Sequence, residues 1–358
     1  MKPVLSNVVL AASLALGALP AVAGTQVGDY LNFSGFGTLG LARTNTDSAD
    51  FIREAQAGGA TTKISANSDS NFGLQLTGTA TPWLSATVQM LSKERTTSYM
   101  TTELEWAFVK VTPLEGLSLR AGRMALPVFA VSDSRNVGFA NNWLRAPSEV
   151  YALAVMDRLN GADVTYSKSI GSSTFTVTAL VGKSESPMTN TIALIADNVH
   201  GLNLQWETDG VTVRLGQVRT KNHVPALGVV DPYKFSGAGI LVDRNNIVAQ
   251  AEYVTRRSAD APAVVNANGW YVLGGYRLGS WVPYASYGST KPKSPNAPFY
   301  LSNRQHTSAL GARWDALKSL DVKFQLERIN TSGTEGVSFT SPVAKPVTAA
   351  SIAVDFVF

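Results

Sequence analysis

Apolar and polar residues alternate with a period of two along most of the chain, which is the pattern of β-strands with one apolar face. The segments Leu202–Glu207, Leu320–Glu327 and Ser351–Phe358 show it clearly. Although 45% of the 358 residues are hydrophobic, no apolar run after the first two dozen residues approaches the ~18 residues of a membrane helix. The chain is therefore predicted to be all-β, either as a soluble protein with a buried core or as one that meets lipid through strands.

Residues 1–23 have the features of a secretory signal peptide. Lys2 is followed by an apolar stretch from Val8 to Leu19, and Ala21-Val22-Ala23 forms a small-x-small cleavage site. No change of composition divides residues 24–358, which we predict to form one exported domain. The chain has no cysteine, which excludes disulfides and thiol chemistry, and its Lys and Arg residues are scattered, which argues against nucleic-acid binding.

The connections between the predicted strands alternate in length. The seven short turns are Pro82-Trp83, Pro113–Gly116, Gly171-Ser172, Asp209-Gly210, Asn245-Asn246, Gly279-Ser280 and Ala316–Ser319. The eight longer polar connections are Thr44–Thr61, Arg95–Tyr99, Met124–Asn160, Lys183–Asp197, Asn222–Lys234, Ser258–Asn268, Thr290–Gln305 and Asn330–Pro346. Together they join about 16 strands, and an even number with short turns on one side is typical of bacterial outer-membrane barrels. A closed antiparallel barrel also pairs every backbone group, which lipid requires.

Aromatic residues support a membrane location. Trp83, Trp206, Trp281 and Trp314 lie at or beside short turns, where an interfacial aromatic belt would form. The chain stops at Phe358, directly after an amphipathic strand. In outer-membrane barrels a terminal Phe is also the feature recognised by the barrel assembly machinery. We favour this role for Phe358 over the alternative that it only completes the apolar face.

The mature chain resembles the Gram-negative general porin family. The resemblance lies in the opening strand Tyr30–Gly37, the closing strand Ala353–Phe358, and the segments Ser132–Gly138 and Trp143–Tyr151 of one outsized connection. It implies a transmembrane antiparallel β-barrel of about 16 strands with a long third loop folded inward. It also implies a homotrimer in the bacterial outer membrane. The acidic Pro-Glu-Phe-Gly segment of the enterobacterial porins is absent, so their pore size and selectivity are not transferred.

The long connection Met124–Asn160 is the most informative segment, because loops of more than 12–15 residues are usually functional or disordered. Phe129, Trp143 and Tyr151 are among its many apolar residues, which need a surface to pack on. Packed against the inner wall, they would leave the charged residues of the segment, Asp157 and Arg158 included, to meet passing solutes. A loop that only covers the rim is the alternative. Strand parity places Arg120 and Arg214 on the luminal face opposite, since charges on the lipid face are costly. The candidates for the pore constriction are Arg120, Asp133, Arg135, Arg145, Glu149 and Arg214.

Three patterns that could indicate enzymatic chemistry are weak in this sequence. Gly35–Gly40 fits G-x-G-x-x-G but leads into a polar loop instead of a helix, so glycines that relieve crowding in a strand explain it better. His200, His223 and His306 are far apart and lack metal-ligand spacing. His306 and Ser308 share a strand face without the third group of a lipase triad. We therefore expect no catalytic residue, cofactor or metal.

The sequence favours an outer-membrane porin for passive diffusion of small hydrophilic solutes and ions. A substrate-selective channel for anions such as phosphate or organic acids is the alternative. A barrel adhesin, a structural barrel or an outer-membrane lipase is less favoured. Since the predicted luminal charges have both signs, ion selectivity is expected to be weak.

Overall fold

The computed structural model describes residues 24–96, 98–187, 192–258, 266–293 and 304–358, so the predicted signal peptide lies outside the described residues. The elements are β1 (Thr25–Val27), β2 (Leu31–Thr44), β3 (Asn71–Thr81), β4 (Leu84–Arg95), β5 (Ser98–Leu114), β6 (Leu117–Ala125), η1 (Gly138–Ala140), α1 (Ser148–Tyr151), β7 (Arg158–Ile170), β8 (Ser173–Pro187), β9 (Ala193–Thr208), β10 (Val211–Val224), η2 (Pro225–Leu227), β11 (Val229–Arg244), β12 (Ile247–Ser258), β13 (Ala267–Tyr276), β14 (Trp281–Pro292), β15 (Gln305–Leu317), β16 (Leu320–Asn330) and β17 (Val347–Val357). No helix in these ranges is long and apolar enough to cross a membrane.

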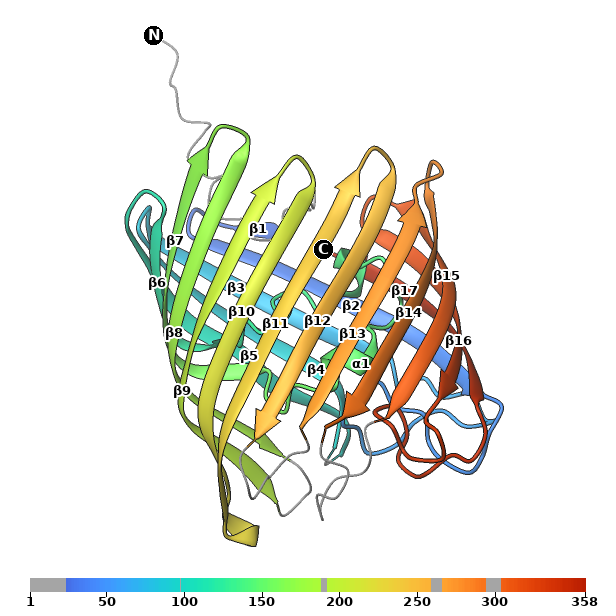
Figure 1. The fold of residues 1–358 in the computed structure, drawn as a ribbon. Helices are drawn as coiled ribbons and strands as arrows, with labels where there is room; N and C mark the ends of the chain where they lie inside the picture. The colour runs from blue at the N-terminus through green and yellow to red at the C-terminus, as the bar shows by residue number, and fades with distance from the viewer. Residues whose placement is uncertain (1–23, 97, 188–191, 259–265, 294–303) are drawn as a thin grey trace.

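The strands form one closed antiparallel barrel (Figure 1). Each strand from β2 to β17 pairs with the next in sequence, and β17 pairs with β2, which closes the ring. The sheet has 17 strands, and the three-residue β1 only extends the edge of β2 beyond the end of β17, pairing with Leu31–Phe33. The ring proper therefore has 16 strands, and the predicted antiparallel barrel of about 16 strands is confirmed.

The two faces of the barrel follow the alternation of the sequence. Leu119, Leu215 and Leu310 are exposed on the outer face, whereas Arg120 and Arg214 occupy the inward positions between such residues. The tryptophans at the short turns are exposed as well, and the rings of Trp281 and Trp314 stack across neighbouring strands with centroids 5.6 Å apart. An apolar outer surface with aromatic residues near one end is the surface a bilayer requires.

The C-terminal residue takes part in barrel closure. The backbone N–H and C=O of Phe358 both bond to Gly35, at 3.0 and 2.9 Å. A Cβ at Gly35 would collide with the ring of Phe358, and one at Gly37 with the ring of Phe356. Gly35 and Gly37 thus make room for aromatic rings across the closing strands, and a Cβ at Gly40 would collide with Asp69, so all three glycines relieve crowding as predicted.

All seven predicted short turns coincide with short connections between strands. Several predicted long connections differ from the structure. Asn222–Lys234 is mostly strand, because β10 runs to Val224 and β11 begins at Val229, and within Lys183–Asp197 β8 runs to Pro187 and β9 begins at Ala193. Arg95–Tyr99 is not a long loop, because β4 runs to Arg95 and β5 begins at Ser98. The first connection is longer than predicted, since β2 ends at Thr44 and β3 begins only at Asn71. Its part from Ala49 to Ala60 packs against Ile329 and Val347 at the ends of β16 and β17 and against Phe339 in the connection between them.

Candidate functional site

The segment Leu126–Asp157 connects β6 to β7 and packs against the inward side of the wall. Its helix α1 contacts β12, β13, β14 and β15, and its 3₁₀ turn η1 contacts β2 and β17. In Figure 1 α1 lies behind the front strands of the barrel. The segment therefore reaches two separate parts of the inner wall.

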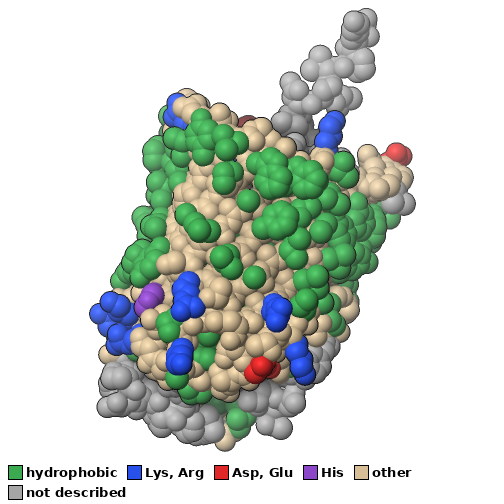
Figure 2. All heavy atoms as spheres, turned by 90° about the vertical axis from the view of Figure 1, so that its right-hand side faces the viewer, with side chains coloured by type: hydrophobic (Ala, Val, Ile, Leu, Met, Phe, Trp, Pro, Cys, Tyr) green, Lys and Arg blue, Asp and Glu red, His purple; other side chains and the backbone are tan. Residues whose placement is uncertain are grey.

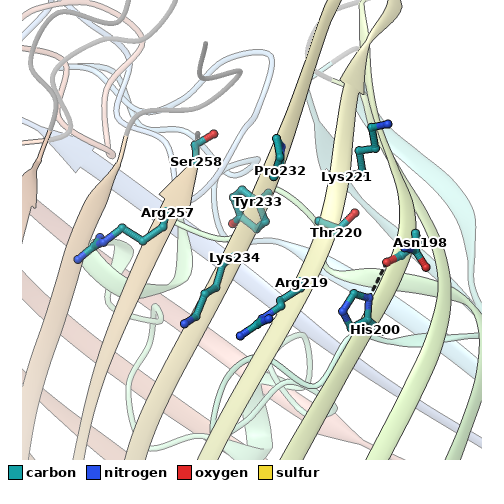
Figure 3. A pocket seen from close by; sticks show the side chains of 10 residues that line it. All are labelled: Asn198, His200, Arg219, Thr220, Lys221, Pro232, Tyr233, Lys234, Arg257 and Ser258. Carbon is teal, nitrogen blue, oxygen red and sulfur yellow. Dashed lines mark hydrogen bonds between the residues drawn. The ribbon is translucent and has the colours of Figure 1, made fainter. Parts of the chain in front are cut away.

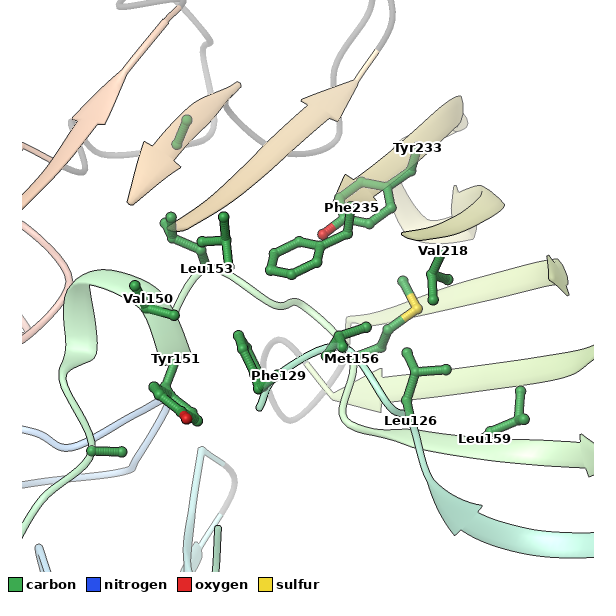
Figure 4. Packing of buried hydrophobic residues seen from close by; sticks show 14 of the residues in the cluster. Leu126, Phe129, Val150, Tyr151, Leu153, Met156, Leu159, Val218, Tyr233 and Phe235 are labelled. Carbon is green, nitrogen blue, oxygen red and sulfur yellow. The ribbon is translucent and has the colours of Figure 1, made fainter. Parts of the chain in front are cut away.

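Aromatic side chains fix one side of this segment (Figure 4). Phe129 stacks on Tyr151 with ring centroids 4.4 Å apart and meets the edge of Phe235 of β11 at 5.7 Å. Trp143 packs edge-on against Tyr271 of β13 at 6.0 Å. All five rings are buried. Such pairs add stability beyond the area they bury, so the segment is held in one position on the wall.

Arg145 fixes the other side. Its guanidinium pairs with Asp69 of the first long connection at 2.5 Å and with Glu327 of β16, and it lies 4.5 Å from the ring centroid of Phe51. Its side chain is 1% exposed. The expectation that Arg145 meets passing solutes was therefore wrong. Burial alone would lower the pKa of Arg145, but Asp69 and Glu327 raise it above its ordinary value, so the group is a permanent cation inside the protein.

Glu149 is also buried instead of exposed to solutes. It accepts hydrogen bonds from Gln305, at 2.8 Å, and from Thr307, both on β15. Two residues further on, the Tyr151 hydroxyl donates to Glu252 of β12 at 2.5 Å, and Glu252 also accepts from the Ala130 N–H at 2.8 Å. Glu149 and Tyr151 of α1 thus attach the segment to the wall, because the carboxylates enclosed there need donors to replace water.

Arg135 belongs to a network of alternating charges. It pairs with Glu54 at 2.5 Å and lies 3.8 Å from Asp157, and Lys93 of β4 binds the other oxygen of Glu54 at 2.9 Å. Burial raises the pKa of Glu54, but Lys93, Arg135 and Arg53 outweigh it and hold that pKa well below its ordinary value. The network continues to Arg95, Glu103, Glu105 and Arg158. The four basic and four acidic residues joined by ion pairs balance, and Arg53 adds one positive charge, so the network contributes little net charge to the lumen.

Arg120, Asp133 and Arg214 remain partly exposed. Arg120 pairs with Asp163 of β7 at 2.5 Å and lies 5.4 Å from the ring centroid of Phe108. Arg214 donates to Asn203 of β9 at 3.0 Å and to the Ala130 carbonyl at 3.1 Å. Asp133 interacts electrostatically with both arginines. Of the six candidates for the pore constriction, these three lie near one another and keep some exposure. Arg120 comes from β6, Arg214 from β10 and Asp133 from the segment between β6 and β7.

The sequence analysis missed the contribution of the first long connection. Asp69 binds Arg145, and Glu54 binds Arg135. Arg53 also donates to the Arg135 carbonyl at 3.1 Å. Their only signal in the sequence was that acidic residues occur in a connection long enough to fold inward. Alternation along β16 predicts that Glu327 faces the lumen, but nothing in the sequence predicts that it binds Arg145.

Further attachments come from two basic residues of the wall. Lys323 of β16 donates to the Gly138 carbonyl at 2.6 Å, and Arg313 of β15 donates to the carbonyls of Phe139 and Asn141 at 2.8 and 3.0 Å. In the described ranges no group of three or more His, Cys, Asp or Glu residues could hold a metal ion. His200 lies at an exposed position of the outer face, as does Ser308 beside His306.

Comparisons with known proteins agree with this architecture. A family model for Gram-negative porins matches residues 10–334. Among solved structures, OmpF of Salmonella typhi in complex with daunomycin is 16% identical with a TM-score of 0.63, over 92% of this chain and 97% of its own. The anion-selective porin from Comamonas acidovorans is 14% identical with a TM-score of 0.59, over 92% and 99%. A trimer form of OmpT from Vibrio cholerae is 12% identical with a TM-score of 0.54, over 92% and 100%. No curated protein matches the chain.

Proposed function

Because the chain belongs to the Gram-negative porin family and forms an outer-membrane channel, we propose that it passes small hydrophilic solutes and ions by passive diffusion through a lumen narrowed by Leu126–Asp157. The observation that carries the proposal is the double attachment of this segment. Tyr151 holds it to Glu252 on β12, and Arg145 holds it to Glu327 on β16. A segment bound at two places on the wall narrows the opening and sets which solutes fit.

Selectivity would be weak, because positive and negative charges balance near the narrow zone. Arg120 is neutralised by Asp163, and Asp133 lies near both Arg120 and Arg214. A channel specialised for anions is less favoured, because it would need arginines that are free to bind the solute. The proposed mechanism is exclusion by size with a small electrostatic bias, and it involves no covalent chemistry.

Single-channel recording in planar bilayers tests this proposal. The purified protein should insert and conduct in steps, show a small reversal potential in a salt gradient, and admit small sugars while excluding larger ones. A barrel that serves as an adhesin would give no steps. Current that saturates and is blocked by one anion would instead show a substrate-selective channel.

We also propose that the protein is a homotrimer. The resemblance to general porins supports this, and one fold neighbour is described as a trimer form.

A further inference from the structure

Four basic side chains form one row across the outer face of β9–β12. In the register Arg219 of β10 lies opposite His200 of β9 and, on its other side, opposite Lys234 of β11. Lys234 in turn lies opposite Arg257 of β12. Arg219 has the same outward parity as the exposed Leu215. Figure 3 shows these side chains on neighbouring strands, lining a shallow groove of about 510 Å³.

The row lies at the edge of the apolar band that is nearest the long connections. Arg219 is nine positions from Gly210 in the short turn before β10, which is ~31 Å along a strand, or about 22–25 Å of height at a tilt of 35–45°. The apolar band of such barrels is about 25 Å tall, and their longer connections face the cell exterior. Figure 2 shows another face of the barrel. Most of the Lys and Arg side chains visible there lie below the apolar band, beside the long connections. The row is thus at the level of the outer-leaflet headgroups.

The positive charges of Arg219, Lys234 and Arg257 are not neutralised within the described part of the chain. No ion pair there involves any of the four, and Arg219 and Arg257 donate only to uncharged oxygens, such as those of Gln217 and Asn268. Asp197, next to the row, already lies 3.4 Å from both Lys183 and His223. Like charges directly opposite on neighbouring strands destabilise a sheet. A bound anion between them would remove that repulsion.

We propose that this row binds the phosphate groups of a phosphorylated lipid of the outer leaflet. Arg forks and a Lys ammonium are suited to phosphate oxygens, and strands about 4.8 Å apart allow one phosphate to contact two neighbouring side chains. The first outward positions below the row are Leu202, Gln217, Ser236 and Thr255, and the next ones are Leu204, Leu215, Ala238 and Tyr253; the apolar ones among them would contact the acyl chains. These apolar neighbours favour a lipid over a soluble phosphate, and the proposal is independent of conduction through the lumen.

The test compares two triple variants with the same change of charge. R219Q/K234Q/R257Q removes the two arginines and the lysine of the row, and K168Q/R244Q/K318Q removes three exposed basic residues at the short-turn end. Binding of diphosphorylated lipid A to the detergent-solubilised protein is measured by native mass spectrometry, with phosphatidylcholine and inorganic phosphate as comparison ligands. Each basic residue near a lipid surface contributes roughly a fivefold factor, so the first variant should bind lipid A about 100-fold more weakly. The second should bind like the wild type.

A gel shift on boiling shows whether each variant is folded. If the triple variant does not fold, single variants such as R219Q replace it, and each should bind lipid A about fivefold more weakly than the wild type. Equal loss in both triple variants, or wild-type binding by R219Q/K234Q/R257Q, would overturn the proposal. Competition by inorganic phosphate as effective as that by lipid A would show a soluble-anion site and reject the lipid. Conductance of both variants should equal that of the wild type.

Discussion

At Arg145 one guanidinium joins three parts of the chain that are distant in sequence: the segment between β6 and β7, the first long connection through Asp69, and β16 through Glu327. A buried ion pair of this kind is not itself strong evidence of stability, because desolvation offsets much of the attraction. Loss of one partner is costly, however, since it leaves charges enclosed without a counter-ion. Arg145 therefore determines the position of the segment more than the strength of the barrel.

Replacing Arg145 by Gln should leave Asp69 and Glu327 buried without their cation. We expect the free energy of unfolding in denaturant to fall by ~3–5 kcal/mol, and single-channel traces to become noisier as the segment detaches. Arg328→Gln is the control, because Arg328 is exposed and donates only to Thr348, and it should change stability by less than about 0.5 kcal/mol. Quiet channels and unchanged stability in Arg145→Gln would contradict the anchoring role.

Arg120 and Arg214 are the two basic constriction candidates that lie on wall strands, and both remain partly exposed. Converting both to Glu should move the reversal potential toward cations, because Asp133 and Asp163 would then have no opposing charge nearby. The shift should shrink as salt approaches 1 M, where the Debye length is ~3 Å. The matched control is Lys291→Glu with Arg328→Glu, which makes the same charge change at exposed residues beside the long connections. Unaltered selectivity in the first variant would place the two arginines away from the ion path.

On the scale of elements, the segment Leu126–Asp157 and the first long connection act together. Residues 49–60 pack on the ends of β16 and β17, and from that position Glu54 and Asp69 reach Arg135 and Arg145. The inner segment is thus held by wall strands and by a second loop. This explains why so few of its charges are left exposed.

Replacing Ser132–Ser148 by a short Gly/Ser linker should widen the channel. The variant also carries Asp69→Asn and Glu327→Gln, so that no charge is left buried where Arg145 was removed. Conductance should rise and larger sugars should pass, because the attachments of Gly138 and Phe139 to the wall are lost. If the barrel still shifts on boiling while conductance and sugar exclusion are unchanged, the segment does not limit the pore.

On the scale of the whole molecule, sixteen strands close through β17 and β2, and this closure leaves each chain with its own complete lumen. Assembly therefore does not have to build the channel. The proposed trimer should have three times the mass of one mature chain in native mass spectrometry and should conduct in groups of three equal steps. A single-chain mass together with single independent steps would contradict it.

Much of this architecture is determined locally. A period of two places Leu215 outside and Arg214 inside whatever the neighbouring strands are, because successive side chains point to opposite faces. Turn sequences such as Asp209-Gly210 set the strand ends, since both residues adopt the positive φ that a tight turn requires. The terminal Phe358 and the length of the inner segment are equally properties of the sequence. Strand number, lumen-facing positions and the presence of a constriction candidate follow from them.

What only the tertiary structure decided is which charges are enclosed. Arg120 and Arg145 are both arginines predicted to face the lumen, yet one keeps part of its surface and the other is completely enclosed. The difference comes from Asp69, Phe51 and Glu327, which lie far away in sequence and meet Arg145 only when the ring closes and the first connection folds inward. Alternation fixes the face on which a side chain lies. It does not fix the partner, because burial and pairing depend on contacts between segments that no local pattern encodes.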